Sequence, residues 1–486
     1  MKSRANARRM ALTISLAGGL VVSFQSAPGQ GIPIEHLQED FQIMRRALEE
    51  AHGGIYRYTS KAEMDRTFDR AYRKIDHPMT ELEFWRLAEP VVAHIKCGHT
   101  RLWFSDTLQS EFETSIPLFP LEVRLLGDHL YVYHDVAHPS SALEGSELLS
   151  INGVPTKYIL KHFRADWTRD SNTRTAISAL IGAKRLFGVD LYAHEIRSPF
   201  RVTYRRLDGK REAAELAGMT TPDWLKAKAK QNPEPDTNAD LKFLDDGKIA
   251  VLTIRHWYDP ERKVTFLDFL KKSFAAMQQN GSHSLIIDLR DNPGGLDAPG
   301  KELFAFLWDQ PFYYDKDLVI NAREFDFFKY AKVPPPPLGI EQQADGRFHN
   351  VKHPNWGLQQ PLTPHFAGRV YALMNGGSFS TSCEFLSMLH FHKRATFIGE
   401  EAAGGYYGCT AGWTATLTLP YSKLVLPIGL VTYYQAVSGY KYPDRGVMPD
   451  YPVAHTIADL LAGRDRDMEL AISLARPNQH LKATPR

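Results

Sequence analysis

Cysteine is scarce in this sequence. Only Cys97, Cys383 and Cys409 occur among 486 residues, too few for the disulfide network that holds small secreted scaffolds together. We expect three small buried residues, with one disulfide plus one free thiol as the alternative. The sequence also lacks Cys-x-x-Cys pairs, His-Glu-x-x-His helices and glycine-rich phosphate loops, so no cofactor and no metal site are predicted.

An excess of charge of one sign is missing too. The 58 Lys and Arg residues nearly balance the 56 Asp and Glu residues, for a formal net charge of +2. Nucleic-acid-binding surfaces need clustered cations, so no nucleic-acid partner is predicted. Beyond the N-terminal segment no run is long and apolar enough to span a bilayer, and no integral membrane domain is expected.

The N-terminus has the layout of a signal peptide. Basic residues between Lys2 and Arg9 precede an apolar stretch from Met10 to Phe24, and small or polar residues follow. This order predicts a signal peptide over residues 1–30 and an exported chain, periplasmic or extracellular. A twin-arginine signal or a retained membrane anchor are the alternatives.

Helical patterns fill residues 31–114. Apolar residues recur at helical spacing from Leu37 to Leu48. Ser60 and Thr80 are each followed by a glutamate three residues later, which is the capping-box pattern at a helix start. We therefore expect a small helical layer here.

Short strands replace the helices over residues 115–220, at 121–125, 129–133 and 200–204. Between them, Glu144 to Gly153 resembles the turn and strand of PDZ domains, which implies a PDZ-like β domain with a helical insertion at 157–190.

A polar linker is expected over residues 221–240. Strands then alternate with helices over residues 241–460, which predicts an α/β layer on a largely parallel sheet. Proline-rich residues 310–366 interrupt this alternation as an expected exposed insertion, and residues 461–486 are expected to form a C-terminal helix and tail.

Two turns could carry chemistry in the α/β layer. The first, Asp288-Leu-Arg-Asp-Asn-Pro-Gly-Gly295, follows an apolar strand, and its glycine amides suit an oxyanion hole. The second, Asn375-Gly-Gly-Ser-Phe-Ser-Thr-Ser-Cys-Glu384, joins a strand to a helix, where unpaired N–H groups face a developing anion. Taken singly, each is more often an ordinary turn or cap.

A third element, Cys97-Gly-His-Thr100, follows the helical layer. A lone histidine is more often structural than catalytic, so His99 gains weight only from the two turns. Together with Ile398 to Gly404 and Gly446-Val-Met-Pro-Asp450, these elements stand in the order seen in tail-specific, or C-terminal processing, serine peptidases. The resemblance covers residues 245–455, and the helical layer with its Gly-His-Thr resembles the tricorn-like branch.

This resemblance implies an α/β core of the ClpP/crotonase type and a catalytic serine. Ser380 matches the nucleophile, with Thr381 and Ser382 as alternatives because Glu384 stands one residue further away than in the family pattern. The amides of Gly294 or Gly295 and of Thr381 would form the oxyanion hole.

The resemblance also bears on the general base. The stretch that carries a lysine base in the bacterial processing branch has no lysine here, so the histidine of the tricorn-like branch, at the position of His99, is favoured. An imidazole suits proton transfer near neutral pH. For the acid that orients it, the pattern points to Asp444, with Glu400 in reserve.

The function implied is therefore hydrolysis of peptide bonds through an acyl-enzyme, by an endopeptidase acting on C-terminal or unfolded segments of a peptide or protein substrate. Two alternatives stay open. The same fold serves as a non-catalytic ligand-binding module, and the same apparatus can act as an esterase or amidase.

Overall fold

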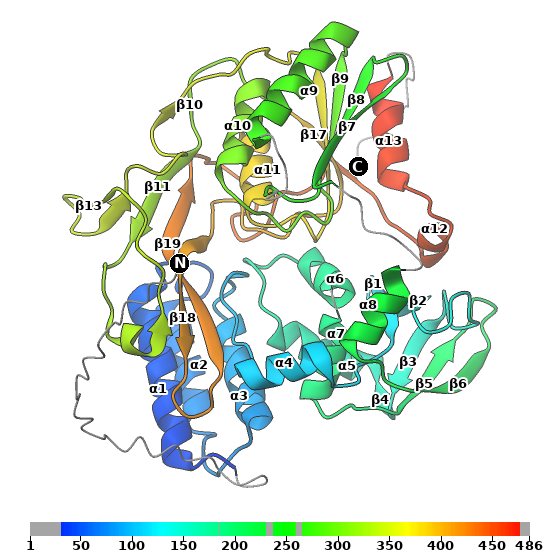
Figure 1. The fold of residues 1–486 in the computed structure, drawn as a ribbon, viewed down its shortest axis with the longest axis vertical. Helices are drawn as coiled ribbons and strands as arrows, with labels where there is room; N and C mark the ends of the chain where they lie inside the picture. The colour runs from blue at the N-terminus through cyan, green and yellow to red at the C-terminus, as the bar shows by residue number, and fades with distance from the viewer. Residues whose placement is uncertain (1–30, 184, 230–236, 259–264, 477–486) are drawn as a thin grey trace, which may run out of the picture.

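The computed structural model describes residues 31–183, 185–229, 237–258 and 265–476. The chain has three parts: a helical layer, a β-rich module and an α/β unit, which meet near the middle of the molecule (Figure 1). The predicted signal peptide lies outside the described residues. No helix among the described residues is long and apolar enough to cross a membrane.

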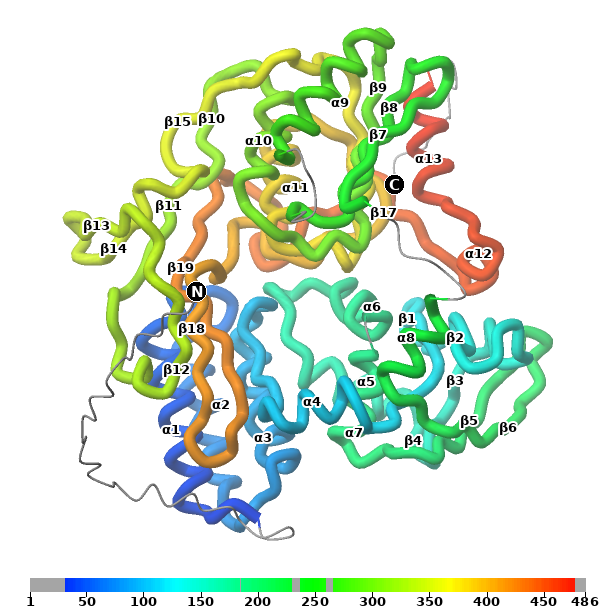
Figure 2. Tube along the Cα trace, viewed as in Figure 1, coloured from blue at the N-terminus to red at the C-terminus, as the bar shows by residue number. Residues whose placement is uncertain are grey.

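The helical layer contains α1 (Ile34–Ala51), α2 (Lys61–Tyr72) and α3 (Glu81–Ala93). The helix starts are as predicted: the Ser60 hydroxyl accepts from the Glu63 N–H, and Thr80 with Glu83 forms a complete capping box. The apolar faces of the helices share one core with β18 (Thr410–Thr418) and β19 (Val425–Gln435). This long hairpin comes from the other end of the chain and runs beside the helices (Figure 2).

The β-rich module is one antiparallel sheet in the order β1-β2-β3-β5-β6, with β4 paired to β3. The strands are β1 (Leu121–Leu126), β2 (His129–Asp135), β3 (Glu147–Ile151), β4 (Val154–Pro155), β5 (Phe200–Arg205) and β6 (Arg211–Leu216). The three strands expected from the sequence are therefore confirmed. Helix α4 (Asp106–Thr114) leads into the module. Between β4 and β5 the chain forms α5 (Thr156–Asp166), α6 (Thr175–Gly182) and α7 (Leu186–Ala193).

The α/β unit contains the predicted parallel sheet, in the order β20-β17-β16-β9-β8-β7, with only β7 antiparallel to its neighbour. Its strands are β7 (Ala239–Leu244), β8 (Ile249–Ile254), β9 (Ser284–Asp288), β16 (Arg369–Met374), β17 (Thr396–Gly399) and β20 (Tyr451–Pro452). Near-continuous apolar strands are typical of a sheet covered on both faces.

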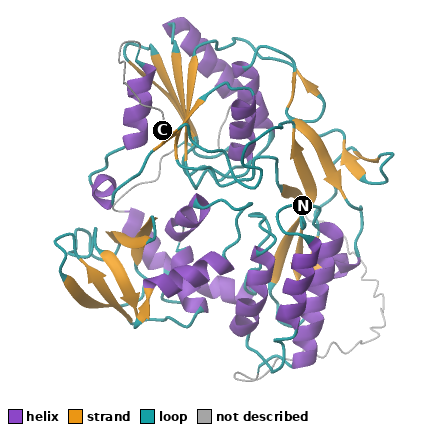
Figure 3. Cartoon of the chain, turned by 180° about the vertical axis from the view of Figure 1, so that it is seen from behind, coloured by secondary structure: helices purple, strands orange, loops and turns teal. Residues whose placement is uncertain are grey.

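Helices cover both faces of this sheet (Figure 3). One face packs on α9 (Phe266–Asn280), α10 (Ala298–Leu307) and α11 (Thr381–Phe391). The other packs on α13 (Arg466–Ala475), which follows the short α12 (Ile457–Leu461).

Two expectations about the chain's organisation are corrected. The stretch 221–240 contains α8 (Thr221–Ala229) and the start of β7, while residues 230–236 lie outside the described part. Residues 310–366 are not simply an exposed insertion, because buried β11 (Asp315–Ile320) pairs with β19. The sequence pattern did not indicate this pairing because the neighbouring strands are short. The other elements of this region are β10 (Phe312–Tyr313), η1 (Asp326–Tyr330, a 3-10 helix), β12 (Ala331–Lys332), β13 (Ile340–Gln342), β14 (Phe348–Asn350) and β15 (Leu358–Gln359).

An ion-pair network fixes the end of β9 to α13. The Arg290 guanidinium donates to Asp288 at 2.7 Å, to Asp465 at 2.6 Å and to Asp467 at 3.0 Å. Burial would lower the pKa of Arg290, but the Asp288 and Asp465 carboxylates raise it above its usual value overall. The arginine of the Asp-Leu-Arg motif therefore acts in the framework beneath the glycine turn.

We expect Arg290→Met to lower the denaturation midpoint, at a cost of about 3 kcal/mol, because three carboxylates lose their shared partner. Burial raises the pKa of Asp465, but the Arg290 charge and hydrogen bonds lower it overall. The stability that this ion pair contributes is fully present above the pKa of Asp465 in the unfolded chain. It is lost as the pH falls through the lower pKa of Asp465 in the folded chain. The variant should therefore lose less stability between neutral pH and pH about 3 than the parent. Arg464→Met, which breaks an exposed pair with Glu469, is the control and should cost under about 1 kcal/mol. Equal midpoints for the Arg290 variant and the parent would contradict the prediction.

Candidate active site

Ser380 lies in the turn between β16 and α11, at the N-cap of the helix. Its backbone has φ 56° and ψ −126°, a conformation that non-glycine residues rarely adopt. Such strain persists only where the surroundings impose it, and it is concentrated at functional sites. The turn thus presents the Ser380 side chain beside the start of a helix.

The two turns predicted from the sequence hold each other in place. The Asn375 side chain accepts from the Asp291 N–H at 2.9 Å, and the Ser378 hydroxyl donates to the Leu289 carbonyl at 2.7 Å. The Phe379 N–H donates to the Asn292 carbonyl at 2.9 Å. Parallel strands β9 and β16 are neighbours, so their carboxyl ends bring these turns together.

His99 meets Ser380 across the boundary between two parts of the molecule. The His99 Nε2 atom lies 3.1 Å from the Ser380 Oγ atom, although 281 residues separate them along the chain. The imidazole packs on the Phe379 ring with 4.6 Å between ring centroids. A serine hydroxyl within hydrogen-bond reach of an imidazole is the arrangement that activates a nucleophile.

The other hydroxyls of the serine turn have different partners. Thr381 Oγ1 donates to the Gly295 carbonyl at 3.2 Å. Buried Ser382 Oγ accepts from Trp257 Nε1 at 2.8 Å and donates to the Asn292 carbonyl at 3.2 Å. Of the three nucleophiles considered from the sequence, the structure brings Ser380 to the histidine.

The predicted oxyanion donors divide into two kinds. The Gly294 N–H already donates to the Asn292 side chain at 2.9 Å. The backbone N–H groups of Gly295 and Thr381 have no hydrogen-bond acceptor among the described residues. Gly294 has a steric role instead, because a Cβ atom at this position would lie 2.6 Å from the Ser380 Cβ atom. The glycine turn therefore packs directly against the serine.

A thiol and two carboxyl groups lie near the histidine. Burial lowers the pKa of His99, but the Cys97 side chain, Asp170 and Asp297 raise it above its usual value overall. Cys97 is on the same turn, Asp170 follows α5, and Asp297 precedes α10. These groups favour the imidazolium that would form during proton transfer.

The acids proposed from the sequence for orienting His99 do not reach it. Asp444 is exposed, and its carboxylate accepts from the Asn172 side chain at 2.7 Å. Glu400 interacts electrostatically with His455 and Asp467 instead. Meanwhile His99 Nδ1 is buried and has no hydrogen-bond partner among the described residues. The assignment of Asp444 is therefore corrected: the loop before Gly446 directs its carboxylate toward the α5–α6 connection.

Asp170 was missed by the sequence reasoning. Its side chain is 3 % exposed and accepts from the Gly98 N–H at 2.5 Å, which ties it to the turn that carries His99. In the sequence, Asp170 stands in a polar connection between two helices. No spacing or motif there distinguishes it from an ordinary turn residue.

Two groups of side chains have the composition of metal ligands, Cys97 with His99 and Asp170, and Asp166 with Asp190 and His194. Their members already interact with protein groups. His99 contacts Ser380, while the His194 imidazole lies 2.5 Å from Asp166. The first group is thus described better as the surroundings of the histidine than as a metal centre.

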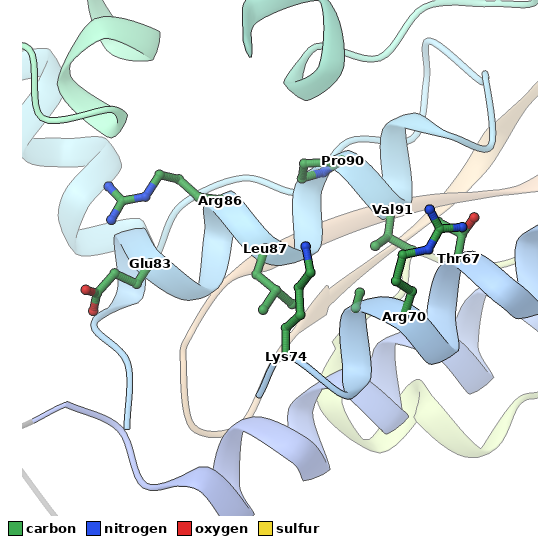
Figure 4. Close-up of a pocket in the computed structure, with 9 residues that line it drawn as sticks. Thr67, Arg70, Lys74, Glu83, Arg86, Leu87, Pro90 and Val91 are labelled. Carbon is green, nitrogen blue, oxygen red and sulfur yellow. The ribbon is translucent and has the colours of Figure 1, made fainter. Parts of the chain in front are cut away.

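A surface hollow of about 420 Å³ lies elsewhere, between α2 and α3 (Figure 4). Arg70, Lys74 and Arg86 line it together with the apolar Leu87. Arg86 is engaged by the Ala193 carbonyl and by Glu195. None of the residues predicted from the sequence as a nucleophile, base or oxyanion donor lines this hollow.

Comparison with known families agrees with the geometry. The profile of peptidase family S41 matches residues 248–453, which contain both turns and every strand of the α/β sheet except the antiparallel β7. Residues 248–453 are an S41 peptidase domain. The family resemblance inferred from the motifs is thereby confirmed, and the chain is a serine-type peptidase.

Similarity of fold to solved structures extends over most of the chain. Mature CPAF complexed with lactacystin is similar with a TM-score of 0.64 and 14% identity, over 91% of this chain and 98% of that chain. Mature CPAF alone gives 0.62 and 14%, over 91% and 96%. The photosystem II D1 C-terminal processing protease gives 0.44 and 13%, over 91% and 98%. No curated protein matches the sequence. At these identities the likeness to CPAF concerns the fold.

Proposed function

We propose that Ser380 is the nucleophile and His99 the general base of this S41 peptidase. Ser380 Oγ attacks the carbonyl carbon of a peptide bond while its proton passes to His99 Nε2. The tetrahedral intermediate collapses as His99 protonates the leaving nitrogen and the C–N bond breaks. Water, deprotonated by His99, then hydrolyses the ester and restores Ser380. The observation that carries this proposal is the 3.1 Å contact between the two side chains.

The oxyanion of the intermediate would be bound by the amides of Gly295 and Thr381. Both N–H groups are without another described partner, and Thr381 opens a helix whose N-terminal amides favour negative charge. Donors of this kind are already oriented before the charge develops, which is why they stabilise the transition state.

The β-rich module would capture an extended segment of the substrate in the manner of a PDZ domain, by adding a strand to an exposed sheet edge. What supports this is the resemblance of Glu144 to Gly153, which includes β3 and the turn into β4. Together with the signal-peptide pattern of residues 1–30, this suggests an exported endopeptidase that acts on C-terminal or unfolded segments.

Hydrolysis of a peptide library tests the proposal. The mature chain is incubated with peptides of mixed sequence and, separately, with small aryl esters, and the products are identified by mass spectrometry. Internal cleavage of peptides that disappears in Ser380→Ala is the expected result. Turnover of esters alone would indicate an esterase, and binding of ligands without turnover would indicate a binding module.

The pH dependence of kcat/KM should have an acidic limb set by His99. The neutral imidazole is the active base, so activity falls as pH drops through the pKa of His99 in the free enzyme. Because Cys97, Asp170 and Asp297 raise that pKa, the limb should lie above the ordinary histidine value of about 6.5. A pH profile with a stable peptide substrate measures this. A limb below pH about 6 would contradict it.

A further inference from the structure

The connection between α5 and α6 packs against the turn that carries the proposed base. The Thr168 hydroxyl donates to the Cys97 carbonyl at 2.8 Å, and the Ser171 N–H donates to the Lys96 carbonyl at 3.0 Å. Between them, Asp170 accepts from the Gly98 N–H at 2.5 Å. Three hydrogen bonds over four residues thus fix the backbone around His99.

Asp170 is also close to the imidazole itself. One of its carboxylate oxygens, a ring nitrogen of His99 and the Cys97 sulfur lie within 4.8 Å of one another. The Nε2 atom of His99 faces Ser380, and the other nitrogen, Nδ1, is buried without a hydrogen-bond partner among the described residues. A buried carboxylate at this range interacts strongly with an imidazolium.

On these observations we propose that Asp170 is the positioning acid of this peptidase: it fixes the turn that carries His99 and stabilises the imidazolium by its charge. The inference rests on the proposed roles of Ser380 and His99. It replaces Asp444, the acid that the motif order indicated. In this mechanism the proton travels between Ser380 Oγ, His99 Nε2 and the leaving nitrogen, and it does not pass to Asp170.

The remaining groups around His99 do not replace Asp170. The Cys97 thiol donates to the Thr410 carbonyl at 3.3 Å, so its hydrogen is directed away from His99. The Asp297 carboxylate accepts from the Tyr433 hydroxyl at 3.0 Å and lies 3.1 Å from His353. Asp170 is the carboxylate bonded directly to the His99 turn.

The fixing role and the charge role can be separated by two substitutions. Asp170→Asn keeps a carbonyl oxygen for the Gly98 N–H but removes the negative charge. Asp170→Ala removes both. Asp128→Asn, in the exposed turn between β1 and β2, is a matched control that removes one carboxylate of the same module.

The test measures kcat/KM against pH for the full mature chain and its variants, with Ser380 labelling by a fluorophosphonate as a second readout. We expect Asp170→Asn to lower kcat/KM at neutral pH roughly 10- to 100-fold. Its acidic limb should move about one pH unit lower, because the imidazolium loses its stabilising charge. Asp170→Ala should lose more activity than Asp170→Asn, and Asp128→Asn should match the parent.

Three outcomes would overturn the inference. If kcat/KM of Asp170→Asn depends on pH as it does in the parent, Asp170 only fixes the turn that carries His99 and does not stabilise the imidazolium. A shift of the limb in Asp444→Asn instead would return the role to the acid indicated by the motifs. Loss of activity in Asp170→Asn with an unmoved limb and a lowered denaturation midpoint would indicate damage to the fold. In each case, Ser380 labelling of the parent shows separately whether the proposed nucleophile stands.

Discussion

Ser380→Ala and His99→Ala should each lower kcat/KM for peptide hydrolysis on the order of 10⁴-fold or more. The alanine at 380 has no nucleophilic atom, and without His99 the hydroxyl loses the base that lies 3.1 Å from it. Since the two residues act as a unit, the double variant should be scarcely worse than either single one. Steady-state kinetics with an internally cleaved peptide gives these values.

Thr381→Val and Ser382→Ala are the controls for the nucleophile. Each removes a neighbouring hydroxyl of the same turn, and neither hydroxyl contacts His99 in the structure. We expect Thr381→Val to stay within about 10-fold of the parent. Ser382→Ala should act on stability, by about 1–3 kcal/mol, because the indole N–H of Trp257 loses its buried acceptor. Loss of all activity in either variant would move the nucleophile to that position.

Gly294→Ala should abolish most activity while leaving the chain folded. The new methyl group would lie 2.6 Å from the Ser380 Cβ atom and 3.0 Å from the Phe379 carbonyl oxygen, so the serine or the glycine turn must move. Displacing the adjacent oxyanion donors from the serine is expected to cost about 100- to 1,000-fold in kcat. The effect should appear in kcat more than in KM.

Gly463→Ala separates this clash from ordinary backbone strain. Both glycines have positive φ, 104° at Gly294 and 64° at Gly463, but nothing lies within 4 Å of a Cβ atom at Gly463. Its substitution should cost about 1 kcal/mol of stability and leave kcat unchanged. If Gly294→Ala retains the kcat of the parent, the glycine turn does not form the oxyanion site.

The sequence predicted much of the fold where signals were local. The helix starts at Ser60 and Thr80 follow from capping, and the parallel sheet follows from apolar strands alternating with helices. It failed where structure depends on distant partners. Buried β11 is held in the sheet by pairing with β19, more than 100 residues later. No sequence pattern within residues 310–366 indicates that partner.

The candidate site divides in the same way. The serine and glycine turns were found because each combines a strand end, small residues and a helix start, and the family resemblance linked both to His99. The supporting acid was misplaced, since Asp444 was chosen by its position relative to Gly446. Its carboxylate bonds to Asn172 in the fold, whereas Asp170 reaches the His99 turn from the connection after α5.

Labelling of the mature chain with a fluorophosphonate, followed by mass spectrometry of its peptides, tests the central claim most directly. The probe phosphonylates a serine only where a base has activated it. The Ser380–His99 assignment predicts one modified residue, Ser380, and no modification in His99→Ala. Modification of Thr381 or Ser382, or unchanged labelling of Ser380 without His99, would contradict it.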